Sequence, residues 1–312
     1  MSQGKHVTSV ARQPPQLARA NGIDICYEIF GEANAEPMLL IMGLGTQMVL
    51  WDDAFCEKLA ARGFRVIRFD NRDIGKSSSL CGGKRLNPLE LLKLKLFGIP
   101  VAAPYRLHDM AEDTIGLMDA LDIRSAHLVG ASMGGMIAQE IAISFPHRVR
   151  SLISIMSTTG NPKLPPPSRE ATAMLTAPPP TTKEDYIARF AQTWKFLRVG
   201  SFPEDEALDR SRTERCFARG LNPAGVGRQL RAILASGGRK ARWRGVTAPT
   251  LVIHGTLDPL VRPEGGKDTA ASIPGARLLM IKGMGHALPI PMWPQVIDAI
   301  ATHAHGAAPK AA

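Results

Sequence analysis

The segment Gly-Ala-Ser-Met-Gly at positions 130–134 constrains the fold more than any other part of the 312-residue chain. It follows a short apolar run at residues 126–129 and precedes a helical pattern at residues 136–145. A Gly-x-Ser-x-Gly sequence at a strand-to-helix turn holds the serine hydroxyl out above a sheet. The sharp turn leaves no room for a Cβ atom at its two outer positions. The pattern predicts Ser132 as a nucleophile, and an idle serine in a glycine-rich turn is the alternative.

Apolar runs typical of buried strands alternate with helical patterns along most of the chain. The expected strands lie at residues 38–42, 65–69, 126–129, 149–156, 250–253 and 277–281. Two more strand-like runs flank Asn21-Gly22, a hairpin signal, within residues 17–30. This alternation predicts an α/β fold with a mostly parallel sheet of eight strands and helices on both faces.

Residues 161–245 interrupt the alternation with proline-rich stretches and helical spacing, and we interpret them as an inserted helical cap. The core is then expected to comprise residues 17–160 and 246–305, after a disordered tail at residues 1–16. Four large apolar residues of the cap point either to the substrate pocket or to the cap's own core, and we favour the latter for most of them. They are Met174, Phe190, Trp194 and Phe196.

Residues 86–104 mix leucines with lysines and predict an amphipathic helix. Such a helix could act as a lid or meet lipid-like substrates. A helix packed on its own domain is the favoured interpretation.

The formal net charge of +10 is concentrated in the cap, where sixteen Lys and Arg against eight Asp and Glu give +8. These arginines are spread along presumptive helices and are not clustered with aromatic residues. We therefore expect a solvated helical face, with nucleic-acid binding as a poorer interpretation. No apolar run approaches the ~20 residues of a membrane helix. We expect neither nucleic acid nor an integral membrane segment among the partners.

The N-terminal residues 1–18 show no apolar signal-peptide core. The four cysteines are scattered and form neither a metal-ligand pair nor a disulfide framework. They are Cys26, Cys56, Cys81 and Cys216. Both observations favour a cytoplasmic location. We expect no metal and no organic cofactor, and the oligomeric state stays open.

A serine hydroxyl needs a base to remove its proton and an acid to orient that base. His286, on the loop after the last expected strand, is the best base, and His254 at the end of a strand is its competitor. Asp258, in the turn after residues 250–253, is the best acid. All three residues follow predicted strands, so a parallel sheet would bring Ser132, Asp258 and His286 to one edge.

The oxyanion formed during acyl transfer requires two backbone amides aimed at it. Met133, directly after the nucleophile, supplies the first in this interpretation. Leu44, in the loop after residues 38–42, supplies the second, and its flanking Gly43 and Gly45 let the backbone turn. Losing one such donor typically costs ~3 kcal/mol.

Five motifs together make the chain resemble the α/β-hydrolase fold enzymes over residues 17–303. They are Gly43-Leu44-Gly45, the run from Asp70 to Ser77, the segment around Ser132, His254-Gly255-Thr256-Leu257-Asp258 and Gly285-His286. Within the fold the chain looks most like aclacinomycin methylesterase and its esterase relatives. It departs from many members by carrying Met42-Gly43 where they have His-Gly, and by the length of residues 86–104.

The resemblance implies a serine carboxylic-ester hydrolase that acts on a small-molecule ester through an acyl-enzyme. Dehalogenases and epoxide hydrolases of this fold use an aspartate at the position of Ser132, which disfavours both. We expect short or medium acyl esters, or a methyl ester of a bulky product. Lactone hydrolysis, C–C bond hydrolysis, haloperoxidase-like activity and a non-catalytic binding or signalling role stay open, since one fold hosts many functions.

Overall fold

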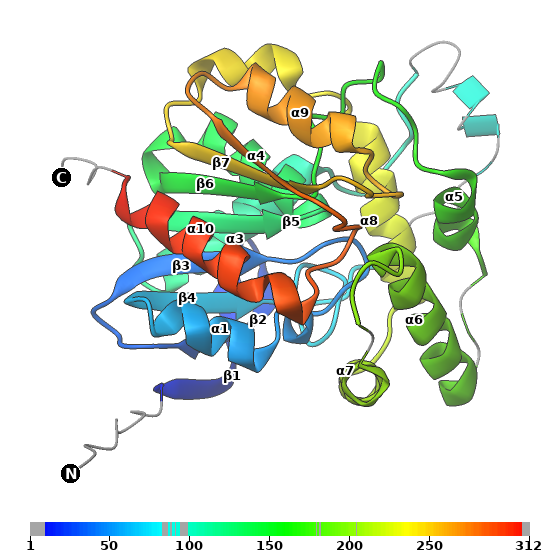
Figure 1. Cartoon of the computed structure of the whole chain (residues 1–312), viewed down its shortest axis with the longest axis horizontal. Helices are drawn as coiled ribbons and strands as arrows, with labels where there is room; N and C mark the ends of the chain where they lie inside the picture. Colours follow the sequence, from blue (N-terminus) through cyan, green and yellow to red (C-terminus); the bar gives the residue numbers. More distant parts are fainter. Residues whose placement is uncertain are drawn as a thin grey trace.

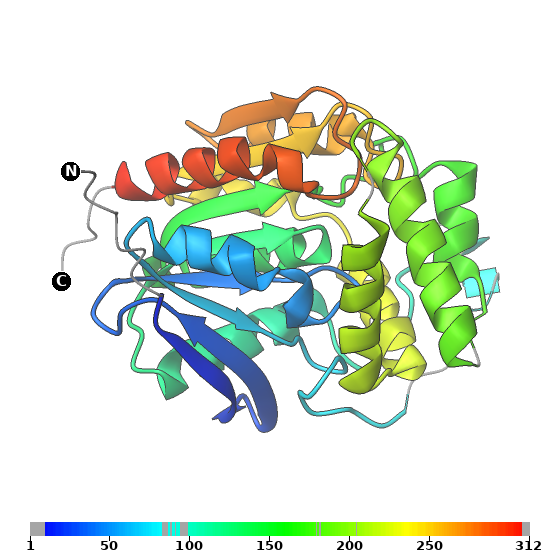
Figure 2. The same ribbon diagram turned by 60° about the horizontal axis from the view of Figure 1, so that its bottom comes forward.

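The protein is described here by a computed structural model, in which a central sheet carries helices on both faces (Figure 1). A further group of helices lies beyond one end of the sheet (Figures 1 and 2). The described residues are 10–82, 87, 89–90, 92–93, 99–178, 180, 182–203 and 205–307.

The sheet has eight strands in the order β1-β2-β4-β3-β5-β6-β7-β8. Their bounds are β1 Arg12–Ala20, β2 Ile23–Phe30, β3 Glu36–Ile41, β4 Phe64–Phe69, β5 Ala126–Ala131, β6 Val149–Ile155, β7 Thr250–Gly255 and β8 Arg277–Ile281. β1 pairs antiparallel with β2 and β2 with β4, whereas the pairs from β4 through β8 are parallel. The predicted mostly parallel eight-stranded sheet is confirmed.

Two apolar cores lie on opposite faces of this sheet, because the apolar strands β3 to β6 present side chains to both. One core contains α1 (Asp53–Ala60) and α10 (Trp293–His305). The other contains α3 (Leu107–Ala120), α4 (Met133–Ser144) and Ile273, which directly follows α9 (Pro263–Ser272). The sheet is therefore covered on both faces by helices.

The N-terminal hairpin begins earlier than the sequence indicated. Residues 1–9 lie outside the described part of the chain, but β1 starts at Arg12, so the prediction of a disordered tail is wrong for residues 12–16. Pro14 and Pro15 argued against a strand there. β1 tolerates them because it is the edge strand, and its pairing with β2 shifts register between Gln13 and Gln16.

Four helices between β6 and β7 lie beyond the carboxyl ends of the parallel strands, and we call them the cap helices (Figures 1 and 2). They are α5 Arg169–Thr176, α6 Lys183–Arg198, α7 Glu206–Ala218 and α8 Pro223–Ser236, followed by the short helix η3 Lys240–Gly245. Each of the four cap helices α5 to α8 begins after a residue whose side chain accepts a hydrogen bond from a first-turn amide. These capping residues are Ser168, Thr182, Asp205 and Asn222.

Eight of the nineteen residues 86–104, where an amphipathic helix was expected, lie outside the described part of the chain. Residues 89–90 and 92–93 are helical, and residues 99–104 have no regular structure. None of the helices that the structure describes combines the length and apolar character needed to span a bilayer.

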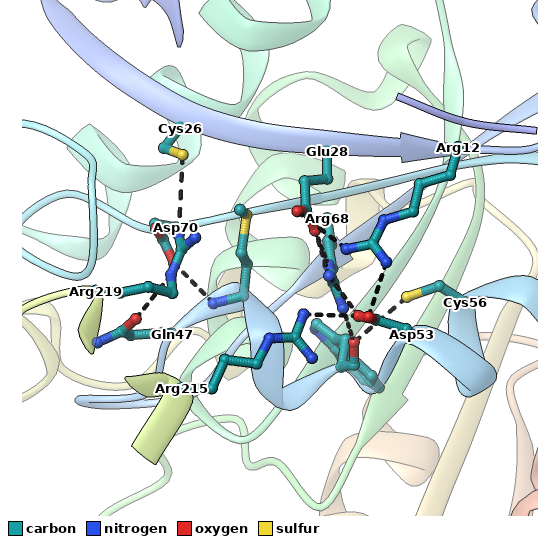
Figure 3. A network of polar contacts seen from close by, with 12 residues as sticks. Arg12, Cys26, Glu28, Gln47, Asp53, Cys56, Arg68, Asp70, Arg215 and Arg219 are labelled. Carbon is teal, nitrogen blue, oxygen red and sulfur yellow. Dashed lines mark hydrogen bonds and ion pairs between the residues drawn. The ribbon is translucent and has the colours of Figure 1, made fainter. Parts of the chain in front are cut away.

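Four arginines of α7 and α8 reach the core and do not lie on a solvated face, and the prediction is wrong for them. They form ion pairs with carboxylates of the core that follow β4 or lie at the start of α1. The pairs are Arg212 with Asp52, Arg215 with Asp53, Arg219 with Asp70, and Arg228 with Asp73. Figure 3 shows Arg219 reaching Asp70 and Arg215 reaching Asp53. The partners lie about 150 residues away in sequence, so helical spacing could not reveal them.

Replacing Arg228 by methionine is expected to lower the free energy of unfolding by about 3–5 kcal/mol, because it leaves a buried carboxylate without its countercharge. Arg228 donates to both carboxylate oxygens of Asp73, at 2.9 and 2.6 Å, and the Asp73 side chain is fully buried. Urea denaturation measures the loss. The matched control is Arg210→Met, which removes an exposed pair with Glu214 and should cost less than about 1 kcal/mol. Equal losses in the two variants would contradict the assigned role of Arg228.

Candidate active site

The turn between β5 and α4 places Ser132 in a strained conformation. Its φ is 56° and its ψ is −119°, outside the regions that L-residues usually occupy. The two glycines of the motif make this turn possible. A Cβ at Gly130 would lie 2.2 Å from the carbonyl oxygen of Gly134, and one at Gly134 would lie 2.0 Å from that of Ile41. Both distances are prohibitive because the two oxygens belong to the backbone, so the motif fixes the turn sterically.

Gly134→Ala is expected to abolish the native turn, seen as loss of soluble protein or of any activity that depends on Ser132. The matched control is Gly227→Ala within α8, where an added Cβ meets nothing within 4 Å. Alanine is the better helix former by about 1 kcal/mol, so the control should be as stable as the wild type or more so. Thermal unfolding of both variants tests this, and an unperturbed Gly134→Ala variant would contradict the steric argument.

The three residues predicted from the sequence meet at the carboxyl edge of the sheet. His286 Nε2 lies 3.0 Å from Ser132 Oγ, and His286 Nδ1 lies 2.7 Å from Asp258 Oδ2. Asp258 is fully buried, and its Oδ1 accepts the amides of Leu260 and Val261 at 2.9 and 2.8 Å. An ionised carboxylate only accepts, so it directs the imidazole proton to Nδ1 and leaves Nε2 free to accept from the serine hydroxyl.

The competing histidine, His254, lies on the other side of the acid. Its Nε2 donates to the carbonyl oxygen of Val261 at 2.8 Å and lies 3.5 Å from Asp258 Oδ2. Burial lowers the pKa of His254, which favours the neutral ring. No contact between His254 and Ser132 occurs among the described residues. His254 therefore contacts the turn that carries Asp258. Of the two histidines, His286 is the one that lies within hydrogen-bond distance of Ser132.

The loop after β3 lies against the serine. A Cβ on Gly43 would be 3.2 Å from Ser132 Cβ, so this glycine lets the backbone approach. Within the described part of the chain, neither the Leu44 nor the Met133 amide donates to any acceptor. The Gly45 amide, in contrast, donates to Gln229 Oε1 of α8 at 2.9 Å. Among the described residues the two predicted oxyanion donors thus have no acceptor, while the Gly45 amide is occupied.

A cavity of about 480 Å³ opens beside these residues. Met42, Ala131 and Ala287 line it, and each is a sequence neighbour of Gly43, Ser132 or His286. Its wall is largely apolar, with contributions from Leu50, Trp51, Phe55, Met156, Trp194, Leu288, Ile290 and Trp293. A polar end contains the paired charges of Asp52, Arg198, Asp209 and Arg212.

Of the four apolar cap residues singled out in the sequence, Trp194 lines this cavity. Phe190 packs its ring against Tyr186 and Trp194 within α6. Among the described residues, no three histidine, cysteine or carboxylate side chains are arranged to hold a metal ion.

Sequence reasoning missed the groups that hold the loops of Gly43 and His286 from outside. Asn71 Nδ2 donates to the Met42 carbonyl at 2.9 Å, and Gln229 contacts Gly45 from the cap. The His286 amide donates to the carbonyl of Leu197, at the end of α6, at 2.7 Å. Asn71 belongs to the motif from Asp70 to Ser77, but nothing in the sequence indicated a role for Gln229 or Leu197 at this site.

Known proteins resemble this chain over nearly its whole length. The family described as alpha/beta hydrolase fold matches residues 36–291. Rhodomycin D methylesterase DauP of Streptomyces sp. (strain C5) is 30% identical, over 94% of this chain and 99% of that protein. Rhodomycin D methylesterase DnrP of Streptomyces peucetius is 29% identical, over the same shares.

A solved structure with a similar fold is the enol-lactonase from Burkholderia xenovorans LB400, at TM-score 0.71 and 24% identity, covering 92% of this chain and 99% of that one. The predicted resemblance to this fold and to its methylesterase members is confirmed, and the names of both curated relatives agree with a carboxylesterase-type hydrolase. The chain belongs to the alpha/beta hydrolase fold family.

Proposed function

We propose that this protein is a serine carboxylic-ester hydrolase that works through an acyl-enzyme on Ser132. The observation that carries the proposal is the continuous chain of hydrogen bonds from Ser132 Oγ through His286 to the buried Asp258. The names of the two curated relatives, both methylesterases, support the same reaction class. The serine at the turn supports acyl transfer, since an ester carbonyl is attacked readily by an activated alkoxide.

In the proposed mechanism, His286 Nε2 takes the proton of Ser132 as Oγ attacks the ester carbonyl carbon. The tetrahedral oxyanion is stabilised by the amides of Leu44 and Met133. When the intermediate collapses, His286 returns the proton to the leaving alcohol, and the acyl group stays on the serine. Water then attacks the acyl-enzyme with His286 as base. The second intermediate collapses by breaking the bond to Ser132 Oγ, which takes the proton back from His286 as the carboxylic acid leaves, and Asp258 stabilises the imidazolium in both halves.

The volume and the lining of the cavity limit the size and polarity of the substrate. The apolar wall of the cavity and its volume of about 480 Å³ fit an apolar group of the size of a small drug molecule. We propose that it receives either a short or medium acyl chain or the bulky part of a methyl ester. In this proposal the helices of residues 161–245 serve as a cap that roofs the pocket, and the reaction needs no metal or organic cofactor.

A panel of esters tests the proposal. It contains p-nitrophenyl esters from acetate to palmitate, methyl esters of aromatic acids and a lactone, each assayed with the wild-type protein. Turnover of esters that falls for the longest chains supports the proposed reaction and pocket. Turnover of the lactone alone would favour lactone hydrolysis, and stable retention of an ester without turnover would favour a binding role.

A further inference from the structure

The loop of residues 42–48, which carries the Leu44 amide, is fixed at both ends by the core. Asn71 holds the Met42 carbonyl, and Asp70 Oδ1 accepts the Met48 amide at 2.8 Å. Both residues directly follow β4. The middle of the loop, where Leu44 lies, requires other contacts.

Two peptide groups flank the Cα of Leu44, and each is held by one side chain. Thr46 Oγ1 donates to the carbonyl of Gly43 at 2.8 Å. Because a peptide group is planar and trans, this bond also orients the Leu44 N–H in the opposite direction. The next peptide group carries the Gly45 N–H, which donates to Gln229 Oε1 at 2.9 Å. The orientation of Leu44 therefore depends on Thr46 within the loop and on Gln229 from the cap.

Gln229 is well placed for such a role because it is fully buried and uses both ends of its amide. Its Nε2 donates to the carbonyl of Arg72 at 2.9 Å, which fixes the side chain and assigns Oε1 to Gly45. α8 also packs closely here, since a Cβ on Gly45 would lie 3.1 Å from Val226 Cγ1. The neighbouring residue Arg228 anchors the same turn of α8 to Asp73.

A second contact from the cap reaches the same loop. Gln47 donates to the carbonyls of Cys216 and Gly220 at 2.9 and 2.8 Å, and Arg219 donates to Gln47 Oε1 at 2.9 Å. Figure 3 shows Arg219 between Gln47 and Asp70. Hydrogen bonds thus connect the loop of residues 42–48 to α8 through Gly45 and to the C-terminal end of α7 through Gln47.

We infer that Gln229 is a positioning residue for the oxyanion hole, through which cap helix α8 holds the Leu44 amide toward Ser132. The inference rests on the proposed function of this site. Gln229 is not a catalytic residue, since its amide is engaged by Gly45 and Arg72. A consequence is that cap docking and oxyanion stabilisation are coupled: a cap that moves away leaves the Leu44–Gly45 peptide group without its partner.

The test compares Gln229→Met with Arg231→Met. The first variant keeps the size of the side chain and removes both hydrogen bonds. The second removes another contact between α8 and the rest of the chain, to Glu90 and the Ala102 carbonyl, without touching residues 42–48. For Gln229→Met we expect kcat to fall about 10- to 100-fold, less than for a lost oxyanion donor, with KM changed by less than about threefold.

A trifluoromethyl ketone, whose adduct with Ser132 carries an oxyanion, should bind Gln229→Met more weakly by the same factor as the loss in kcat. The carboxylic acid product should bind both proteins equally. Arg231→Met should change thermal stability without changing the ratio of ketone to acid affinity. Equal losses of kcat in both variants, or an unchanged ketone affinity in Gln229→Met, would overturn the inference.

Amide hydrogen exchange of the wild-type protein, followed by NMR, tests the contact on which the inference depends, even if Gln229→Met does not fold or no ester is turned over. The Gly45 amide should exchange much more slowly than the Leu44 amide, which has no acceptor among the described residues. Rapid exchange at Gly45 in the folded protein would refute the contact. Absence of ester turnover with a protected Gly45 would instead count against the proposed function alone.

Discussion

Ser132→Ala is expected to lower kcat for ester hydrolysis by about 10⁶, because no other group takes over the nucleophile of such a triad. KM should change little, since the cavity and the oxyanion amides are left intact. Among the described residues, the Ser132 hydroxyl hydrogen-bonds to His286 Nε2 at 3.0 Å, and the proposed proton transfer uses this bond. Initial rates with a p-nitrophenyl ester, at enzyme concentrations high enough to detect the residual activity, measure the loss.

The matched control is Ser144→Ala at the other end of α4, where the hydroxyl contacts Glu140. It should retain wild-type kcat and KM. A Ser132→Ala variant that is folded and keeps more than about one per cent of wild-type activity would show that the chemistry does not pass through this hydroxyl.

Asp258→Asn is expected to lower kcat by about 10⁴ through the wrong histidine tautomer. Oδ1 of Asp258 accepts two backbone amides, from Leu260 and Val261, so the oxygen of an asparagine would occupy this position. Its NH2 group would then face His286 Nδ1, where the carboxylate oxygen lies at 2.7 Å. The imidazole would carry its proton on Nε2 and could no longer accept the serine proton.

Steady-state kinetics between pH 6 and 9 measure the effect of Asp258→Asn, with Asp119→Asn as the control. Asp119 is an exposed carboxylate that pairs with Arg148 and has no role in the proposed mechanism, so its variant should retain full activity. Activity of Asp258→Asn within about tenfold of the wild type would contradict the proposed orientation of His286.

The catalytic candidates were predictable from sequence because the fold gathers strand ends. Ser132, Asp258 and His286 each follow a strand of the parallel part of the sheet, so local motif recognition was enough to place them at one edge. The glycines around Ser132 were predictable for the same reason, since the steric limits of the turn depend on the local backbone.

Features that depend on distant partners were not predictable. Helical spacing in α7 and α8 indicated solvated arginines, but their partners, Asp70 and Asp73 among them, come from the loop after β4. Gln229 looked like an ordinary helix residue, and only the packing of α8 shows that it holds Gly45. The start of β1 was hidden because Pro14 and Pro15 argue against a strand unless the strand is known to lie at the edge of the sheet.

The most direct test of the proposed acyl-enzyme is rapid acid quenching during turnover of p-nitrophenyl acetate, followed by mass spectrometry of the digested protein. We predict one acetyl group on the peptide that contains Ser132, formed within the burst of p-nitrophenol and absent from Ser132→Ala. An acetyl group on another residue that is kinetically competent, or steady ester hydrolysis with Ser132 never acylated, would contradict the proposed mechanism.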